Sequence, residues 1–570
     1  MPLFGTPRRH VGNAVAHPGL PPHRHPQTTP LRSARLIACS LMSTCLALAS
    51  ARADDCALVE SRSSLAPLSG ARIAAVDIVA EGAHLPGPAS FLDRFHAVSR
   101  DATIRRQLLF APGDTVDTLR VSETLRRLRR QRLFEDVVVA ARRCGDAGDV
   151  RILVRSRDIW TMRPTARLKT PSLLSFGLED RNVFGSGRSV AVLQEMSTRG
   201  RGAALSIVDP WLFGTDVAGA LRVASLGGAH AFRAGVRNHE YSVFDRWRTE
   251  ANVARLSFGD TIVSERALHT VNAMVLVGRR VGGGFRSATT LVAGAEFDSA
   301  TSISSSTGTL LAGQKKARSF LGVDVGVTHR TAQFDTASWI APGRGFLDVP
   351  IGFESDVVIG VGHERAADVA ALKLDSWIGR VWIPRRGSIF MADGWLSGYL
   401  GHGVDANHIA RASFAWYADA ARGMWGLRLT GEQMLQVDPD RRGLSLMTLA
   451  DYASPALPRN VARGGHSIAA SAERNLRVRP IGASSVLDAG GFVAGSYRWR
   501  VPDVPGEQLR AGVVGLRARV LSANGGVNSI RFDVGYPVIR SEIMPNRAFA
   551  TMTIGTLFDV SRQRDGRRIY

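Results

Sequence analysis

Residue combinations that perform catalysis are missing from this sequence. It contains no P-loop, no His-Glu-x-x-His zinc motif, no Gly-x-Ser-x-Gly nucleophile elbow and no cysteine pair at zinc-binding spacing. Gly185-Ser186-Gly187 lacks the third glycine of a dinucleotide-binding loop and indicates a turn, and the isolated His363-Glu364 is typical of loop polarity. We therefore expect a protein that is not an enzyme and that uses neither a metal nor another cofactor.

The N-terminal residues predict export from the cytoplasm. Residues 1–53 read as an extension and a secretory signal, in which Arg32 and Arg35 precede an apolar run over residues 36–49. Small residues follow this run, as signal cleavage requires. The run is shorter than the roughly 20 residues that a spanning helix needs, so a cleaved signal is favoured over a membrane anchor.

The four cysteines acquire a different meaning in an exported chain. Cys39 and Cys45 lie within the predicted signal and would be removed with it, which leaves Cys56 and Cys144. Two cysteines in an exported protein are a natural disulfide pair. Two free thiols are the alternative.

A mixed α/β pattern occupies residues 54–158. Apolar residues predict strands near residues 73–79, 137–141 and 150–154, with two helical segments between the first strand and the second. The resulting order is β-α-α-β-β. This order predicts a small α+β domain.

The second predicted helix of this domain has two distinct faces. Apolar positions recur at helical spacing on one face, at Leu119, Leu125 and Leu128 together with Ser122. The other face carries four arginines, Arg126, Arg127, Arg129 and Arg130. We interpret the arginines as a solvated surface, with an interaction face as the alternative.

From Trp160 to the end the period of the apolar residues becomes two. Leu321, Val323, Val325 and Val327, for example, alternate with glycine, Asp and Thr. Such alternation also occurs in soluble β-sandwiches, but here it recurs over about 410 residues with almost no helix, which exceeds one sandwich. Large aromatic residues flank the segments. The pattern predicts an all-β transmembrane barrel with an apolar outer face, and direct counting gives 16 to 20 strands.

Two segments 27 residues apart resemble the first two periplasmic turns of the BamA/TamA superfamily of bacterial outer-membrane proteins. The matching residues of the first turn are Asn182, Phe184, Gly185 and Gly187. Those of the second turn are Asp209, Pro210, Trp211, Phe213 and Gly214. The β-α-α-β-β unit is similar to a POTRA domain, with residues 132–137 at the usual step from helix to strand.

The resemblance implies a three-part chain in the outer membrane. Residues 1–53 are the extension and signal, residues 54–158 a POTRA-like periplasmic domain, and residues 159–570 a β-barrel of about 16 antiparallel strands. It also implies a seam between the first strand, at about 160–170, and the last, at about 548–558, that serves as a lateral gate.

Barrels of this superfamily carry an Arg-Gly-aromatic motif on a long loop inside the lumen, and its Arg contacts an Asp-x-Gly on a nearby strand. Asp488 and Gly490 match the acceptor strand, and Arg463-Gly464 is the favoured match on the loop, without the aromatic residue. Arg442 is a second candidate, and an eroded motif is the remaining alternative. A pair of Arg463 and Asp488 would be a charge-assisted lock between loop and wall.

In the same family the second strand of a POTRA domain lies outermost in its sheet. Val137, Val138, Val139, Ala140 and Ala141 would then be an edge that binds an unfolded client by β-augmentation. The resemblance thus implies an assembly or translocation factor that binds an unfolded protein client, outer-membrane lipid including lipopolysaccharide, and a further periplasmic or inner-membrane partner. A passive pore or surface antigen with a cationic lumen, or a structural outer-membrane protein, is the alternative.

The formal net charge of +22 suggests nucleic-acid binding at first sight. Six of the arginines, however, lie in residues 1–53, where no acidic residue occurs. The excess that remains is spread over the barrel segments and not gathered in one patch. Because an Arg on the lipid face near the midplane costs roughly 2–4 kcal/mol, most of these residues should face the lumen or lie in loops. We therefore expect no nucleic-acid partner.

Overall fold

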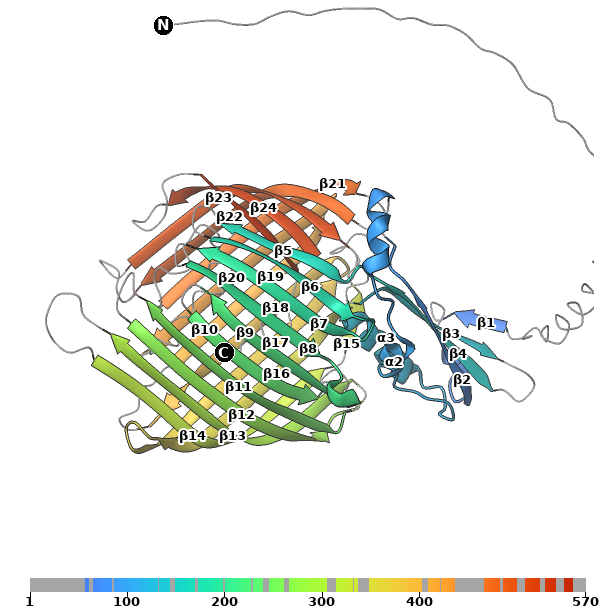
Figure 1. Ribbon diagram of the computed structural model, residues 1–570, viewed down its shortest axis with the longest axis horizontal. Helices are drawn as coiled ribbons and strands as arrows, with labels where there is room; N and C mark the ends of the chain where they lie inside the picture. Colours follow the sequence, from blue (N-terminus) through green and yellow to red (C-terminus); the bar gives the residue numbers. More distant parts are fainter. Residues whose placement is uncertain are drawn as a thin grey trace, which may run out of the picture. The chain divides into compact units, whose positions relative to one another are not determined.

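The computed structural model describes residues 57–60, 65–84, 87–131, 133–143, 149–169, 173–197, 200–226, 229–238, 245–260, 266–284, 286–304, 314–331, 333–336, 348–401, 408–420, 422–435, 466–481, 485–499, 508–522, 528–539 and 548–556. These residues form a small α+β domain and a large barrel (Figure 1). The predicted extension and signal lie outside the described residues. Among the described residues, no helix has the length and apolar character to cross a membrane.

The N-terminal domain contains the predicted β-α-α-β-β order, preceded by one further strand. Its strands are β1 (Ala57–Glu60), β2 (Ile73–Glu81), β3 (Phe134–Arg143) and β4 (Val150–Asp158). Its helical segments are η2 (Ala66–Leu68), η3 (Gly87–Phe95), α2 (Asp101–Arg105) and α3 (Thr118–Arg130). The sheet order is β1-β3-β4-β2, with β3 antiparallel to both of its neighbours and β2 parallel to β4.

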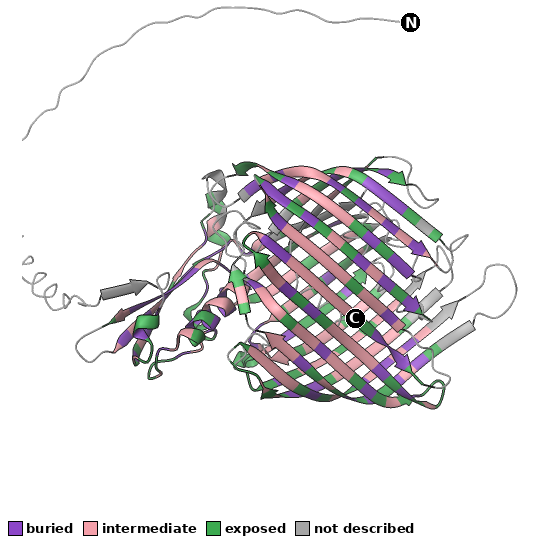
Figure 2. Ribbon diagram, turned by 180° about the vertical axis from the view of Figure 1, so that it is seen from behind, coloured by how far each residue is buried: buried purple, intermediate pink, exposed green. Residues whose placement is uncertain are grey.

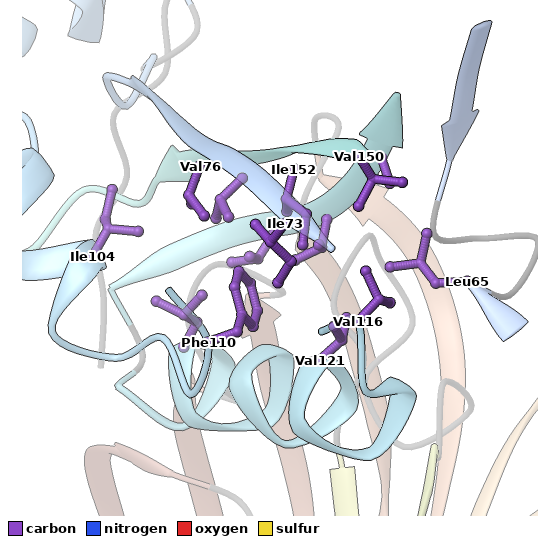
Figure 3. Close-up of a cluster of buried hydrophobic side chains, with 14 of the residues drawn as sticks. Leu65, Ile73, Val76, Ile104, Phe110, Val116, Val121, Val150 and Ile152 are labelled. Atoms are coloured by element: carbon purple, nitrogen blue, oxygen red, sulfur yellow. The ribbon is translucent and has the colours of Figure 1, made fainter. Parts of the chain in front are cut away.

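One apolar core holds this domain together. Figure 3 shows Phe110 and Val121 on the helical side of the core and Ile73 and Ile152 on the sheet side. Ile73, Ile104 and Ile152 are completely buried. The alternating burial along β4 places its even-numbered apolar residues in this core, because side chains alternate across a strand.

The apolar face of α3 differs from the predicted one. Asp117 caps the helix by accepting a hydrogen bond from the Leu119 amide, so the Leu119 side chain lies in the first turn and is 42% exposed. The buried residues of α3 are Val121, Glu123, Thr124, Arg127 and Leu128. The prediction of Leu128 was correct and that of Leu119 was wrong, because the helix begins at the rim of the core.

Residues 162–556 form a closed barrel of antiparallel strands. The first strands are β5 (Met162–Lys169), β6 (Leu173–Val183), β7 (Arg188–Ser197), β8 (Gly200–Asp209), β9 (Val217–Leu226), β10 (Ala229–Asn238) and β11 (Trp247–Asp260). They are followed by β12 (Arg266–Gly282), β13 (Ser287–Ser304), β14 (Gln314–Thr331), β15 (Gln333–Thr336), β16 (Asp348–Glu364), β17 (Val369–Arg385) and β18 (Ser388–Leu400). The last are β19 (His408–Ala420), β20 (Gly423–Leu435), β21 (His466–Ile481), β22 (Ser485–Trp499), β23 (Gln508–Ser522), β24 (Asn528–Ile539) and β25 (Phe549–Thr556). Pairing of β25 with β5 closes the barrel.

The wall has 20 strands in the described part of the chain, because β15 prolongs β14 along the same partner. β14 pairs with β16 up to Arg330 opposite Glu354, and β15 continues from Gln333 opposite Ile351. The transmembrane barrel class is confirmed. The number of about 16 strands that the resemblance implied is too low, and the upper end of the direct count is correct.

Alternation along the strands sorts apolar and polar side chains between the two faces of the wall. Val323 and Val325 on β14 are 62% and 58% exposed, whereas Asp324 between them is 2% exposed. Figure 2 shows the same alternation of exposed and buried residues on other strands. An apolar outer face and a polar inner face are the arrangement that a bilayer requires.

Two aromatic residues depart from the predicted flanking belt. Trp247 is 56% exposed at the start of β11, as a belt residue should be. Trp211 and Trp395 are buried instead, and the indole of Trp395 donates a hydrogen bond to Asp375 at 2.9 Å. An indole N–H inside the barrel needs such an acceptor, which aromatic spacing in a sequence does not reveal.

Candidate functional site

The first turn at the N-terminal end of the barrel is bonded to the α+β domain. Asn182 is 1% exposed and donates from Nδ2 to Oγ of Ser99 at 2.9 Å and to the carbonyl of Ala97 at 3.3 Å. Its Oδ1 accepts the backbone N–H of Gly187 at 2.8 Å. One amide side chain therefore closes the turn and attaches the domain to it. We call the contacts of residues 182–187 and 209–214 with this domain the joint.

Gly185 brings the backbone of this turn against the domain. Its carbonyl accepts hydrogen bonds from the Arg100 N–H at 2.9 Å and from Oγ1 of Thr103 at 2.8 Å. Its φ is +72°, and a Cβ atom added to it would overlap the carbonyl oxygen of Val98. Both the backbone conformation and the close approach therefore require glycine.

The second turn packs against the first. Asp209 organises it by accepting the Trp211 N–H at 2.9 Å and the Arg188 Nε–H at 2.9 Å. At Gly187 a Cβ would lie 3.2 Å from Thr103 and 3.7 Å from Pro210, so Gly187 lies between the domain and the second turn. The turn residues matched by sequence are thus brought together in space.

Each of the two turns presents an aromatic side chain from a left-handed backbone conformation. Phe184 has φ 54° and is 76% exposed, and Phe213 has φ 53° and is 90% exposed. Glycines with positive φ follow both, at Gly185 and Gly214. This conformation costs a residue other than glycine roughly 1–2 kcal/mol, so the surrounding hydrogen bonds must hold it.

The connection between the domain and the barrel is also fixed by polar contacts. Asp158, the last residue of β4, is buried and accepts the Ser99 N–H at 2.6 Å, with Nε2 of His96 at 3.3 Å. Thr161 donates to Oδ1 of Asp180 at 2.8 Å. Sequence reasoning missed Asp158, Ser99 and Thr103, because their partners lie 59 or more residues away and no local motif marks them.

The arginine face of α3 contacts the barrel. The guanidinium of Arg126 lies 3.8 Å from the ring centroid of Phe334 on β15, and that of Arg130 lies 5.2 Å from it. Arg127 is 9% exposed. The interpretation of this face as a solvated surface is therefore wrong at these positions. The face of an aromatic ring attracts cations electrostatically, so the contacts of Arg126 and Arg130 with Phe334 hold α3 against β15.

Asp488 lies on the inner wall within a group of charged residues from β21, β22, β23 and β24. Its Oδ2 lies 3.8 Å from Nη2 of Arg519, and Arg519 also donates from Nη1 to Glu473 at 3.4 Å. Arg517 binds both carboxylate oxygens of Asp533, at 2.8 and 3.1 Å, and contacts Glu473 as well. Asp488, the predicted acceptor for an arginine of the loop, therefore already lies beside Arg519 of the barrel wall.

The described residues include the strand side of the predicted lock, Asp488 and Gly490. Oδ1 of Asp488 is buried and has no hydrogen-bond partner among the described residues. A Cβ at Gly490 would overlap the carbonyl oxygen of Arg474, so β21 and β22 approach closely there. Arg463, Gly464 and the alternative Arg442 lie outside the described residues.

A second polar network covers the inner wall from β13 to β18, and sequence reasoning missed it. Asp298 accepts from the Tyr399 hydroxyl at 2.9 Å and from Arg318 Nη2 at 3.3 Å. Lys373 on β17 reaches Glu296 on β13. Tyr399 is 1% exposed, so these contacts are buried. The negative charge of Asp298 is paired with the guanidinium of Arg318. Within the described residues no group of three or more His, Cys, Asp or Glu side chains is arranged to hold a metal ion.

Among the described residues, the seam that closes the barrel is the shortest strand pairing between wall neighbours. β25 and β5 pair in register at three positions, from Thr551 opposite Lys169 to Thr553 opposite Arg167. Apart from the short β15, which pairs with β16 at four positions as a continuation of β14, every other pair of neighbouring strands in the described wall is in register at seven or more positions. The two strands of the seam are also short, with 8 residues each against 18 in β13 and in β14.

The predicted client edge is not outermost in its sheet. β1 pairs antiparallel with the far half of β3, with Val59 opposite Ala141 and Glu60 opposite Ala140. Val137, Val138 and Val139 pair with β4 on their other side, and their side chains are buried. The prediction of an open edge over residues 137–141 is therefore wrong at Ala140 and Ala141. Sequence reasoning did not foresee the extra strand because four residues are too few for a clear period.

The cysteines of the predicted disulfide lie outside the described residues. Their chain neighbours are described, and Ala57 is paired with Arg143. Cys56 precedes Ala57 and Cys144 follows Arg143 in the sequence.

No protein-family model and no curated protein matches the chain. Among solved structures it is similar to BamA from Haemophilus ducreyi lacking POTRA domains 1–3, at 11% identity over 85% of this chain and 84% of that one, with a TM-score of 0.33. It is also similar to CdiB from Acinetobacter baumannii (11% identity, 88% and 77% covered, TM-score 0.36) and to CdiB from Escherichia coli (10% identity, 85% and 76% covered, TM-score 0.43). The fold of the chain, a transmembrane β-barrel after a small α+β domain, follows from its own strand pairing.

Proposed function

We propose that the chain is an outer-membrane assembly or translocation factor whose periplasmic α+β domain binds an unfolded protein client and whose barrel inserts or passes it. The observation that carries this proposal is the three-residue pairing between β25 and β5. A barrel that only encloses a pore gains nothing from one weak seam, whereas a barrel that admits a client strand from the side needs one.

Physical reasons favour opening at this seam. A strand needs about 9–11 residues to cross a bilayer at the usual tilt, and the two seam strands have 8 each. The described seam strands are therefore shorter than a full crossing, and a short crossing favours local thinning of the bilayer. Separating three paired positions breaks few hydrogen bonds, each with a net value on the order of 1 kcal/mol.

The domain is attached close to the seam. The joint uses the turns after β6 and β8, and β5 and β6 are adjacent in the wall. A client bound by the domain would thus be held near the strands that separate. The resemblance of these turns to those of the BamA/TamA superfamily supports the same arrangement, with the domain in the periplasm and the barrel in the outer membrane with its lipopolysaccharide.

A cross-link across the seam tests the proposal. Leu168 and Met552 are register partners, and a cysteine at each position would fall within the range of a disulfide. The matched control joins Leu178 to Val192 in the wall between β6 and β7. Both variants are made in a background with Cys56→Ser and Cys144→Ser and are compared in cells that contain no other copy of the protein.

We expect the seam disulfide to lower the amount of assembled outer-membrane or secreted client proteins, with recovery after reduction, and the control disulfide to have no effect. Equal client levels with a fully formed seam disulfide would contradict the proposal. Deleting residues 71–158 should give a loss of similar kind, because the client-binding domain would be missing.

A passive pore is the second candidate, favoured by the arginines of the inner wall. Arg517, Arg519 and Arg531 come together there with Glu473 and Asp533. Single-channel recording in a salt gradient distinguishes the two functions. A stable anion-selective current that the seam disulfide leaves unchanged, with unchanged client levels, would favour the pore.

A further inference from the structure

We infer that β1 is a resident occupant of the strand-binding edge of β3, which a client strand must displace. This inference rests on the proposed function and adds the regulation of its binding edge. The observation is the pairing of Ala57–Glu60 with Ala140–Arg143, antiparallel and in register. An incoming strand would take this position in β-augmentation.

The sheet is complete without β1. β3, β4 and β2 form its central part, and β3 pairs with β4 from Phe134 to Arg143. β1 adds four residues at one end of the order β1-β3-β4-β2. It resembles an added strand, such as a bound peptide would provide, and differs from the strands that carry the core.

Where no disulfide joins Cys56 to Cys144, the small size of β1 makes it exchangeable. Four paired residues supply few inter-strand hydrogen bonds, and each contributes on the order of 1 kcal/mol net. Removal of the predicted signal, residues 1–53, would place β1 close to the new chain end, and segments near a chain end open with the lowest local free energies in a protein. A client strand that pairs along more of β3, including Val137 to Val139, would form a longer ladder and would replace β1.

Coverage of the edge also has a physical advantage for the protein. An open edge strand with unpaired N–H and C=O groups templates aggregation with other chains. Among the described residues, β1 covers the far half of this edge until a client arrives. The surface therefore accepts an extended polypeptide strand, and its own chain supplies the first one.

The test uses the full-length protein in detergent micelles and a fluorescent peptide with the sequence of residues 54–61, in which Ser replaces Cys56. The chain carries Cys56→Ser and Cys144→Ser so that pairing alone holds β1. In one variant Leu58→Pro and Val59→Pro remove two consecutive backbone N–H groups, at least one of which faces β3. The matched control has Leu58→Ala and Val59→Ala, which keep both N–H groups.

We expect the proline variant to bind the peptide at least tenfold more tightly than the parent and the alanine control, measured by fluorescence anisotropy. Equal affinity in all three proteins, or no binding to a proline variant whose barrel is folded by heat-modifiable gel migration, would overturn the inference. The seam cross-link in cells is independent of this measurement. Loss of the peptide effect with an active seam cross-link phenotype would thus reject the role of β1 and retain the proposed function.

Discussion

Asn182 on the first turn of the barrel donates a 2.9 Å hydrogen bond to Ser99 of the α+β domain, across 83 residues of sequence. Both side chains are buried. The same amide closes its own turn through Gly187. A single residue therefore couples the shape of a barrel turn to the position of the domain.

Asn182→Ala should loosen the joint. It leaves buried polar groups of Ser99 and Gly187 without their partner, at a cost of about 1–3 kcal/mol. We expect faster hydrogen exchange at the Ser99 and Gly187 amides and faster proteolysis between domain and barrel. Asn238→Ala is the control, because the hydrogen bonds of Asn238 in the described part of the chain stay within the barrel, to Thr249 and Trp247. Equal exchange at the joint in both variants would refute the prediction.

Gly185→Ala should weaken the joint more than the same change at Gly70. Both glycines have positive φ, +72° and +86°, so both substitutions strain the backbone. Only at Gly185 would the new Cβ overlap a backbone oxygen, that of Val98, whereas nothing lies within 4 Å of a Cβ at Gly70. Hydrogen exchange at Arg100, whose N–H bonds to Gly185, measures the difference. A larger effect at Gly70 than at Gly185 would show that strain and not contact decides.

Phe334→Leu should release α3 from β15. The ring lies 3.8 Å from the Arg126 guanidinium, and the loss of a cation–π pair of this kind costs about 0.5–2 kcal/mol. We expect faster hydrogen exchange in residues 118–130 with unchanged barrel stability. The control is Phe353→Leu, at a ring that lies beside His329 in the outer wall. Protection of α3 that is unaffected by Phe334→Leu would mean that other contacts hold the helix.

Asp488→Ala tests the predicted loop lock. Because Oδ1 of Asp488 has no described hydrogen-bond partner, we propose that it binds Arg463 of the loop before β21. Removal of the carboxylate should accelerate proteolysis of that loop on intact cells and change the conductance, and Arg463→Ala should do the same. If Asp488→Ala changes the loop and Arg463→Ala does not, Arg442→Ala is the next variant to compare. No change in either measurement with Asp488→Ala would reject the lock.

Cys56 and Cys144 should form a disulfide in the exported protein. Ala57 is opposite Arg143 in an antiparallel ladder, and one further step along both strands leads to the two cysteines. Paired residues of such a ladder have Cα atoms about 4.5–5.5 Å apart, within the range of a disulfide. Mass spectrometry of non-reduced peptides should detect the bridge, and the oxidised protein should bind the residue 54–61 peptide more weakly than the reduced one. Two alkylated free thiols in protein taken from the outer membrane would contradict this prediction.

Local sequence patterns were enough to predict the kinds of secondary structure and their order in this protein. The alternation at Leu321, Val323 and Val325 fixed the barrel class, because side-chain direction in a strand has a period of two whatever its neighbours are. The glycine and asparagine residues near position 185 indicated a turn, because glycine adopts positive φ without strain and an asparagine side chain bonds to nearby backbone groups. Both are local properties. The β-α-α-β-β order was likewise visible from helical and strand periods.

Only the tertiary structure decided which distant residues meet. The register between strands decides the pairing of β1 with β3, the closure of the 20 strands of the described wall and the neighbours of Asp488. The joint depends on it as well, since it joins Asn182 to Ser99. Register is set by the sum of many weak contacts around a closed sheet, and no single segment carries it. The sequence by itself therefore determined the kinds of elements and their faces, and the closed barrel with its bonded domain determined the seam, the joint and the covered edge.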